Sequence, residues 1–248
     1  MSGHSKWAKI KHKKAKDDAV RGRIFSRLIR EITVASRHGG DPNSNPRLRS
    51  AIEGARGYNM PQDNIERAIK RGTGEAEGSS YEEISYEGYG PGGVAILIEV
   101  ITDNRNRTTS ELRHLFSRMG GNLASAGSVA WQFQTRGIIA IDSSKYDEDT
   151  VLGLGLEGGA LDVSKENGTI TLTTNAEDFK KMKDILSQNK VETVRSELTR
   201  VPQNTVPVAD REAEKVLKLY EALDEHDDVQ HVYANFDIPD EILEKFSG

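Results

Sequence analysis

The residues of this sequence best suited to chemistry are basic, and they gather near its beginning. The first sixteen residues contain no Asp or Glu, and their lysines are Lys6, Lys9, Lys11, Lys13, Lys14 and Lys16. A phosphate backbone is bound by positive charge spread along a surface. Trp7 and His12 lie among these lysines and can stack on unpaired bases. This arm predicts contact with nucleic acid; an acidic protein partner, or no specific partner, is the alternative.

The charge of the chain is divided between a basic part and an acidic part. The whole protein has a formal net charge of −5, but residues 1–78 hold 17 Lys and Arg against 9 Asp and Glu, a net of +8. Residues 79–248 therefore carry −13. Such asymmetry indicates a basic module attached to an acidic body.

Three amphipathic helices are expected to position the arginines of this module, at residues 17–38, 45–58 and 61–71. In the first, the apolar residues face one side, and Arg23, Arg27, Arg30 and Arg37 lie within an arc of about 80° on the other. Asn45 suits the start of the second helix, and Gly72 the end of the third. The pattern predicts a small bundle. Its expected nucleic-acid contacts are Arg23, Arg27, Arg30, Arg47, Arg49, Arg67, Lys70 and Arg71.

A second polar motif, residues 102–108, lies where a strand is expected to give way to a helix. Arg105 and Arg107 can hold phosphate there, and Asp103 or Asn104 can cap the helix. The alternative is a capped turn with exposed arginines. Asp103 alone does not supply the clustered carboxylates that a magnesium-dependent nuclease needs.

The rest of the chain predicts two α/β domains, which makes the fold class α+β. After a linker at 72–80, strands are expected at 81–89, 94–102 and 129–134, with a helix at 106–119. Residues 137–199 have the order βαββαβ, which is the ferredoxin-like order, with strands expected at 137–142, 160–165, 169–174 and 191–199 and helices at 147–157 and 176–188. A helix at 210–224 and a strand at 229–235 would complete the interrupted domain. We therefore predict domains at 1–78, at 79–135 with 203–248, and an inserted one at 136–202.

Several classes of protein are excluded or disfavoured by what the sequence lacks. There is no cysteine, and therefore no disulfide framework, thiol nucleophile or Cys-based zinc site. The six histidines have no metal-binding spacing, and neither a Gly-x-Ser-x-Gly elbow nor a phosphate-loop motif is present. No run of 18 apolar residues or secretory leader is visible. We expect no enzymatic activity, metal, cofactor or membrane partner.

Long motifs of this sequence resemble the YebC/PmpR family. They include residues 2–12, 25–32, 39–42 and 45–49, followed by 59–69, 86–94, 102–108 and 120–123. The resemblance covers essentially the whole chain and is densest in residues 2–133. It implies a cytoplasmic, non-enzymatic protein of three domains, the first helical and the other two α/β.

The resemblance implies two different polyanions for the same basic module. The family is usually described as DNA-binding transcriptional regulators. Members are also described as translation factors acting on ribosomes stalled at consecutive prolines, and a mitochondrial relative as a translational activator for cytochrome oxidase subunit I. DNA and ribosomal RNA, and hence the ribosome, are both expected partners. A protein-interaction scaffold is the third alternative.

Overall fold

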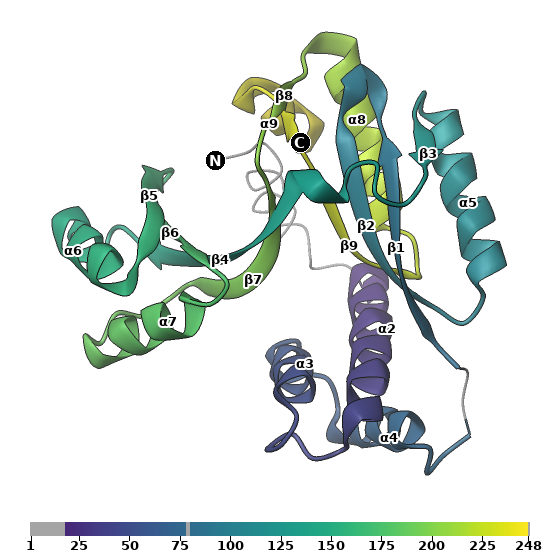
Figure 1. Ribbon diagram of the computed structural model, residues 1–248, viewed down its shortest axis with the longest axis horizontal. Helices are drawn as coiled ribbons and strands as arrows, with labels where there is room; N and C mark the ends of the chain where they lie inside the picture. Colours follow the sequence, from purple (N-terminus) through teal and green to yellow (C-terminus); the bar gives the residue numbers. More distant parts are fainter. Residues whose placement is uncertain (1–17, 78–79, 248) are drawn as a thin grey trace. The chain divides into compact units, whose positions relative to one another are not determined.

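The computed structural model of the protein describes residues 18–77 and 80–247. The chain divides into two compact units (Figure 1). One is the inserted segment Trp131–Asn204, and the other combines the residues before it with those from Thr205 onward. The expected α+β class is confirmed, with N-terminal helices and antiparallel sheets. The further division of the larger unit into two domains stays a prediction.

The described part of the larger unit starts with the three helices expected from the sequence. They are α2 (Asp18–Ala35), followed by a short 3-10 turn (Ser36–His38), α3 (Pro46–Gly57) and α4 (Gln62–Thr73). Asn45 begins α3 as predicted, because its side chain accepts a hydrogen bond from the Leu48 amide at 3.1 Å. The Asn45 amide group also donates to the carbonyls of Ala35 and Gly39, both at 2.8 Å. One buried side chain thus fixes the connection between two helices.

The predicted end of the third helix at Gly72 is wrong. Helix α4 continues to Thr73, and Gly74 ends it in the left-handed conformation with φ 83°. Gly72 lies inside the helix, where a Cβ atom would collide with the Thr33 carbonyl and the Ser36 hydroxyl. The glycine is there because α4 crosses closely against α2 and its 3-10 extension.

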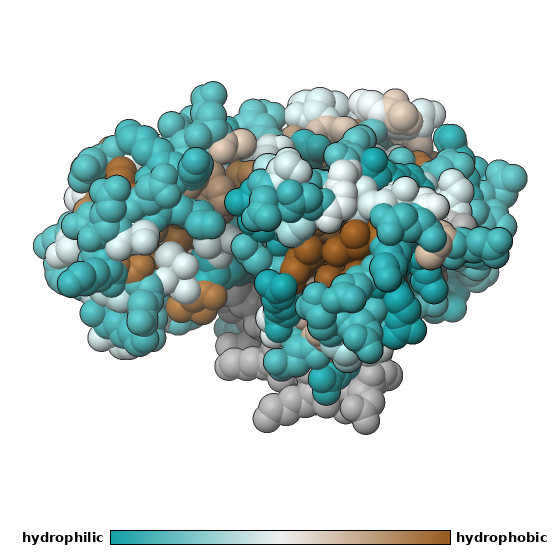
Figure 2. All heavy atoms as spheres, turned by 90° about the horizontal axis from the view of Figure 1, so that it is seen from below, coloured by the Kyte–Doolittle hydropathy of each residue, from teal (hydrophilic) through white to brown (hydrophobic). Residues whose placement is uncertain are grey.

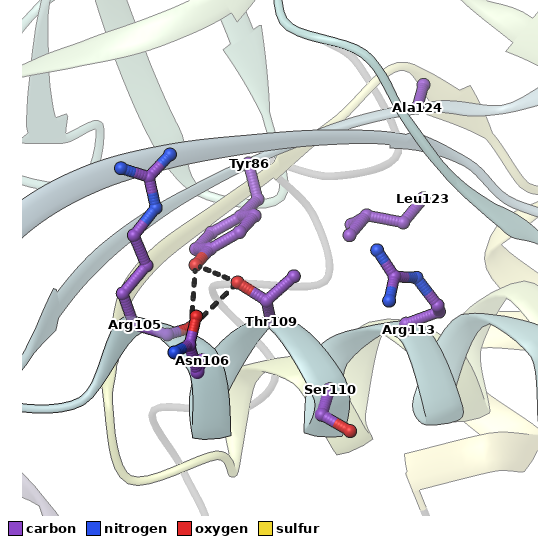
Figure 3. Close-up of a pocket in the computed structure, with 8 residues that line it drawn as sticks. All are labelled: Tyr86, Arg105, Asn106, Thr109, Ser110, Arg113, Leu123 and Ala124. Carbon is purple, nitrogen blue, oxygen red and sulfur yellow. Dashed lines mark hydrogen bonds between the residues drawn. The ribbon is translucent and has the colours of Figure 1, made fainter.

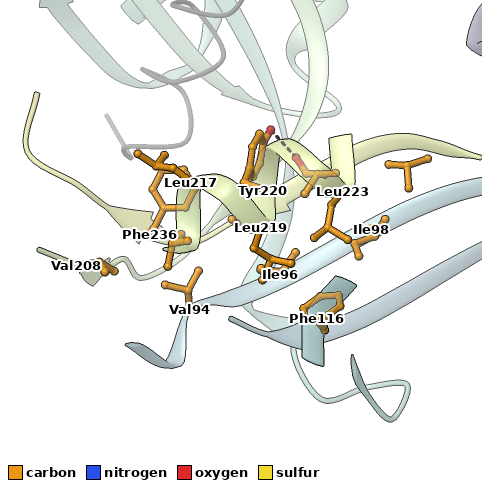
Figure 4. Close-up of a cluster of buried hydrophobic side chains, with 14 of the residues drawn as sticks. Val94, Ile96, Ile98, Phe116, Val208, Leu217, Leu219, Tyr220, Leu223 and Phe236 are labelled. Atoms are coloured by element: carbon orange, nitrogen blue, oxygen red, sulfur yellow. Dashed lines mark hydrogen bonds between the residues drawn. The ribbon is translucent and has the colours of Figure 1, made fainter. Parts of the chain in front are cut away.

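The larger unit also contains a four-stranded antiparallel sheet in the order β3-β1-β2-β9. Its strands are β1 (Glu82–Tyr89), β2 (Ala95–Thr102), β3 (Asn122–Ala124) and β9 (Val229–Ala234). Helices α5 (Arg105–Arg118) and α8 (Asp210–Asp224) share one buried cluster with Ile96 and Ile98 of β2 (Figure 4). Gly88 of β1 is required because a Cβ atom there would lie 2.6 Å from the ring of Phe116. Both helices therefore cover the same face of the sheet.

Several short elements of this unit were not expected. Residues 122–124 form the edge strand β3, which pairs with β1 and which the sequence does not predict. The chain ends with β8 (Val206–Pro207) paired in parallel with β10 (Phe236–Asp237), and with α9 (Asp240–Ser247). The predicted strand at 229–235 is confirmed as β9, which pairs with β2 across more than 125 residues of sequence, for example Ile98 with Val232.

The inserted unit has the predicted βαββαβ order and a sheet in the order β5-β6-β4-β7. Its elements are β4 (Phe133–Asp142), α6 (Glu148–Gly158), β5 (Ala160–Glu166), β6 (Thr169–Asn175), α7 (Phe179–Gln188) and β7 (Arg195–Pro202). Two expectations are wrong. The strands predicted at 129–134 and 137–142 are one strand, β4, preceded by a 3-10 turn (Ala130–Gln132), and β7 begins at Arg195 instead of 191.

The surface drawn in Figure 2 is mostly hydrophilic. Among residues 18–77 and 80–247, none of the helices has the length and apolar character that a bilayer span requires.

Candidate nucleic-acid interface

The arginine stripe of α2 lies against an acidic turn that joins α8 to β9. Arg23 Nη2 is 3.0 Å from Glu225 Oε1, and Arg27 Nη1 is 3.3 Å from Asp224 Oδ1. Arg30 Nη2 is 3.4 Å from Asp228 Oδ1, and Arg30 also donates to the Asp227 carbonyl. We call residues 224–228 the acidic turn. The arginines predicted to bind phosphate are therefore brought together, but each one contacts an acidic residue of the same chain.

Asp228 is the buried centre of this contact. Its Oδ2 atom accepts hydrogen bonds from Arg107 Nη2 at 2.7 Å, from the Thr108 hydroxyl at 2.7 Å and from the Thr102 hydroxyl at 3.1 Å. Burial alone would raise the pKa of Asp228, but the hydrogen bonds from Arg107 and Thr108 outweigh it and hold that pKa below its usual value. The carboxylate is thus charged and ties α5 and β2 to α2.

The motif at 102–108 forms a capped turn, which was the alternative to a phosphate-binding site in the sequence analysis. Asn104 Oδ1 accepts from the Arg107 amide at 3.1 Å, and the Thr102 hydroxyl accepts from the Asn104 amide at 3.0 Å. Arg107 pairs with Asp103 at 3.1 Å as well as with Asp228. Arg105 is exposed and does not take part in this network with its side chain. Arg105 and Arg107, the two arginines predicted here to bind phosphate, therefore do not act together: Arg107 is held in the network of Asp228, and Arg105 is exposed.

Two side chains of the acidic turn and one of α5 together have the composition of a metal site. Single ligand atoms of Glu111, His226 and Asp228 all lie within 4.8 Å of one another. His226 Nε2 is already 2.9 Å from Glu111 Oε2. The Asp228 carboxylate is neutralised by Arg30 and Arg107, and two guanidinium groups at one carboxylate oppose the approach of a cation. We assign no metal to this cluster, which the sequence could not reveal because α5 and the turn are far apart along the chain.

The predicted contacts on α3 and α4 divide into paired and exposed residues. Arg47 bridges Glu31 at 2.8 Å and Glu83, and these carboxylates raise its pKa. Arg49 donates to the Pro42 carbonyl at 3.1 Å, which closes the preceding loop. Exposed basic side chains remain on α4. Arg67 donates to the Asn64 side chain and to the Asp63 carbonyl, and Lys70 and Arg71 lie in the last turn.

The basic arm of the sequence lies outside the described residues. It contains the predicted contacts Lys6, Trp7, Lys9, Lys11, His12, Lys13, Lys14 and Lys16.

A buried carboxylate that the sequence did not single out organises the loop after β3. Glu87 of β1 accepts hydrogen bonds from the amides of Gly127 at 2.7 Å, Val129 at 2.6 Å and Ala130 at 2.8 Å. Burial alone would raise the pKa of Glu87, but these backbone donors lower it below its usual value of 4.5. Its position in a strand next to a glycine turn gave no signal of this role.

Replacing Glu87 with glutamine should lower the free energy of unfolding by about 1–3 kcal/mol, because an amide nitrogen would face backbone donors. The pKa of Glu87 is depressed in the folded state, so its contribution is present at neutral pH and is lost as the pH falls through that pKa. Urea denaturation at pH 7 and in mild acid would measure both effects. Glu82→Gln, at an exposed position of the same strand, is the control and should change stability by less than about 0.5 kcal/mol.

Comparisons with known proteins agree over the whole chain. Residues 5–75 match a family model described as the TACO1/YebC protein N-terminal domain, and residues 81–236 match one described as the TACO1/YebC second and third domain. A probable transcriptional regulatory protein from Dictyoglomus turgidum is 56% identical over 249 residues, covering 100% of both chains. One from Sulfurihydrogenibium is 54% identical over 251 residues, again covering 100% of both. A crystal structure of a conserved hypothetical protein from Aquifex aeolicus is 49% identical with a TM-score of 0.81, covering 92% of this chain and 95% of that one.

Proposed function

The chain belongs to the TACO1/YebC family, and from this premise we propose that it is a nucleic-acid-binding regulator of gene expression that acts on DNA as a transcriptional regulator. The names of its relatives support a regulatory role. The observation that carries the proposal is the net charge of +8 on residues 1–78 in a chain whose remainder carries −13. The protein would act in the cytoplasm and without catalysis.

The described part of the basic module favours contact with phosphates over contact with bases. Arg67, Lys70 and Arg71 lie on the exposed side of α4, opposite the buried Ile65 and Ala68. Phosphate contacts position a protein on a nucleic acid without reading its sequence. This supports binding through the backbone, with any selectivity supplied by the shape of the nucleic acid or by another surface.

A second candidate function is translation regulation by binding ribosomal RNA. It is favoured by the absence of an evident row of Asn, Gln and Arg for base reading on α3 and α4. Structured RNA is recognised largely by shape and through its backbone. A lysine-rich arm that carries Trp7 suits such a surface.

Crosslinking in living cells separates the two functions. The protein would be crosslinked to nucleic acid and purified under denaturing conditions, and the recovered DNA and RNA would be sequenced. Enrichment of discrete promoter DNA is the expected result. Enrichment of large-subunit ribosomal RNA with little DNA would replace the transcriptional role by the translational one. Recovery of neither nucleic acid would overturn the proposal and favour a protein partner.

The lysine arm offers a direct test in solution. The triple replacement of Lys11, Lys13 and Lys14 by alanine should weaken nucleic-acid binding about tenfold at low salt, because up to three phosphate contacts are lost. The slope of log K against log salt should also become shallower by up to about 3. Fluorescence anisotropy over a salt series measures both quantities.

The matched control for the arm removes the same charge elsewhere. Lys180, Lys215 and Lys218 are exposed on α7 and α8, and their triple replacement by alanine should leave the salt slope unchanged. Equal effects from the two triple variants would mean that net charge alone, and not the arm, governs binding.

A further inference from the structure

A groove along α5 has the features of a binding site. It is not formed by the basic helices α2, α3 and α4. Its cavity volume is about 500 Å³, within the range of about 300–1,000 Å³ typical of ligand sites. Arg105, Asn106, Ser110 and Arg113 of α5 line one side (Figure 3). Tyr86 of β1 and residues of β3, including Leu123, complete the lining. Hydrogen-bond donors from one helix thus face a groove whose other wall is partly apolar.

The groove is electrostatically suited to anions. None of the residues that line it is acidic. Within residues 18–77 and 80–247, the guanidinium groups of Arg105 and Arg113 have no carboxylate at ion-pair distance. Arg107, two residues from Arg105, is instead held by Asp103 and Asp228 on a different side of the helix. Because guanidinium groups bind phosphate oxygens with directed hydrogen bonds, two uncompensated arginines beside one groove favour a phosphate-bearing ligand.

The spacing of the two arginines favours an extended ligand. Arg113 lies eight positions after Arg105, which corresponds to about 12 Å along a helix. Between them, the Tyr86 hydroxyl and the Thr109 hydroxyl are 2.7 Å apart, so their hydrogen bond holds the centre of the groove in place (Figure 3). Single-stranded nucleic acid combines spaced phosphates with apolar base faces, and grooves that bind it combine positive charge with apolar or aromatic surface.

We propose that the α5 groove binds a single strand of nucleic acid, with Arg105 and Arg113 contacting two of its phosphates. This inference rests on the proposed function, because it assumes that the protein binds nucleic acid. The groove would be a further contact surface, on the α/β part of the larger unit, in addition to the contacts proposed for α3, α4 and the lysine arm. Polar side chains of α5 such as Asn106 and Ser110 would contact the same strand.

The lack of cysteine in this chain allows a direct test of the site. Ser110→Cys places the only thiol of the protein in the groove at an exposed position. A single strand of about 12 nucleotides, as DNA or as RNA, should slow alkylation of this thiol by iodoacetamide at least about fivefold. Ser85→Cys is the control. Ser85 is exposed on β1 next to Tyr86 and therefore points to the other face of the sheet, so its alkylation rate should not change.

A charge variant tests the two arginines themselves. Arg105→Gln combined with Arg113→Gln should weaken binding of the strand about tenfold at low salt and make the salt slope shallower by about 1.4. The control is Arg118→Gln combined with Arg211→Gln, which removes two exposed arginines outside the groove and should change affinity less than twofold.

The outcomes distinguish the groove from the protein's general binding of nucleic acid. If the wild-type protein binds the strand but the thiol at position 110 stays unprotected, or the groove variant binds as tightly as wild type, the groove inference is wrong and the proposed function stands. If the wild-type protein shows no salt-dependent binding at all, the proposed function fails and the inference fails with it.

Discussion

Replacing Asp228 with alanine is expected to lower the free energy of unfolding by about 3 kcal/mol, the lower end of the loss seen when one partner of a buried ion pair is removed. Asp228 is only 3% exposed in its side chain, and its loss would leave the buried hydroxyls of Thr102 and Thr108 without their shared acceptor. The effect stays at the lower end because Arg107, at 42% exposure, keeps Asp103 and can turn toward water. Urea denaturation followed by circular dichroism would measure it.

The neighbouring residue supplies the control for this prediction. Asp227 is exposed, and only its backbone carbonyl accepts the hydrogen bond from Arg30. Asp227→Ala removes the same charge from the same turn and should change stability by less than about 0.5 kcal/mol. Similar losses from the two variants would show that the charge of the acidic turn matters and that the hydrogen bonds of Asp228 do not.

The sequence predicts elements well where local signals agree with tertiary packing. Helix α8 has the predicted bounds of 210–224. Asn45 caps α3 as predicted, because this capping residue stands directly before the residues with the apolar helical period. The prediction fails where packing overrides the local signal. Gly72 is a helix terminator by type, yet close packing against Thr33 explains its place inside α4. Residues 129–142 contain a polar break at 134–136, but pairing of β4 with β7 from Phe133 to Ala140 carries the strand through it.

The site shows a second limit of sequence reasoning, which concerns what faces a predicted surface. The period of α2 placed Arg23, Arg27 and Arg30 on one side, and the structure has them on one side. Their carboxylate partners come from residues 224–228, about 200 positions later, and no local pattern could indicate that contact. Replacing Arg27 or Arg30 would therefore disturb an internal ion pair as well as any contact with nucleic acid, and the acidic turn is the better place for a test.

Neutralising the acidic turn is expected to tighten nucleic-acid binding. In the triple variant Asp224→Asn, Glu225→Gln and Asp227→Asn, Arg23 and Arg27 lose their charged partners, while Asp228 and its hydrogen bonds are kept. Arg27 keeps its hydrogen bond to the backbone carbonyl of residue 224, but both guanidinium groups lose their carboxylates and can then contact phosphate. The repulsion between phosphate and three carboxylates also disappears. We expect affinity for DNA to rise about 10–100-fold at low salt, and the salt slope to become steeper by about 2 as two arginines gain phosphates.

A matched variant separates this local effect from a change in net charge. The control is the triple variant Asp149→Asn, Glu157→Gln and Asp184→Asn. These residues are exposed on α6 and α7 of the inserted unit, and their replacement removes three negative charges, as in the acidic-turn variant. This control should raise affinity less than threefold, because it changes the net charge equally but leaves the carboxylate partners of Arg23 and Arg27 in place. Anisotropy titrations over a salt series would compare the two. If the acidic-turn variant gained no more affinity than the control, α2 would serve only to hold the helices to the sheet, and the phosphate contacts would have to come from α4, the α5 groove and the lysine arm.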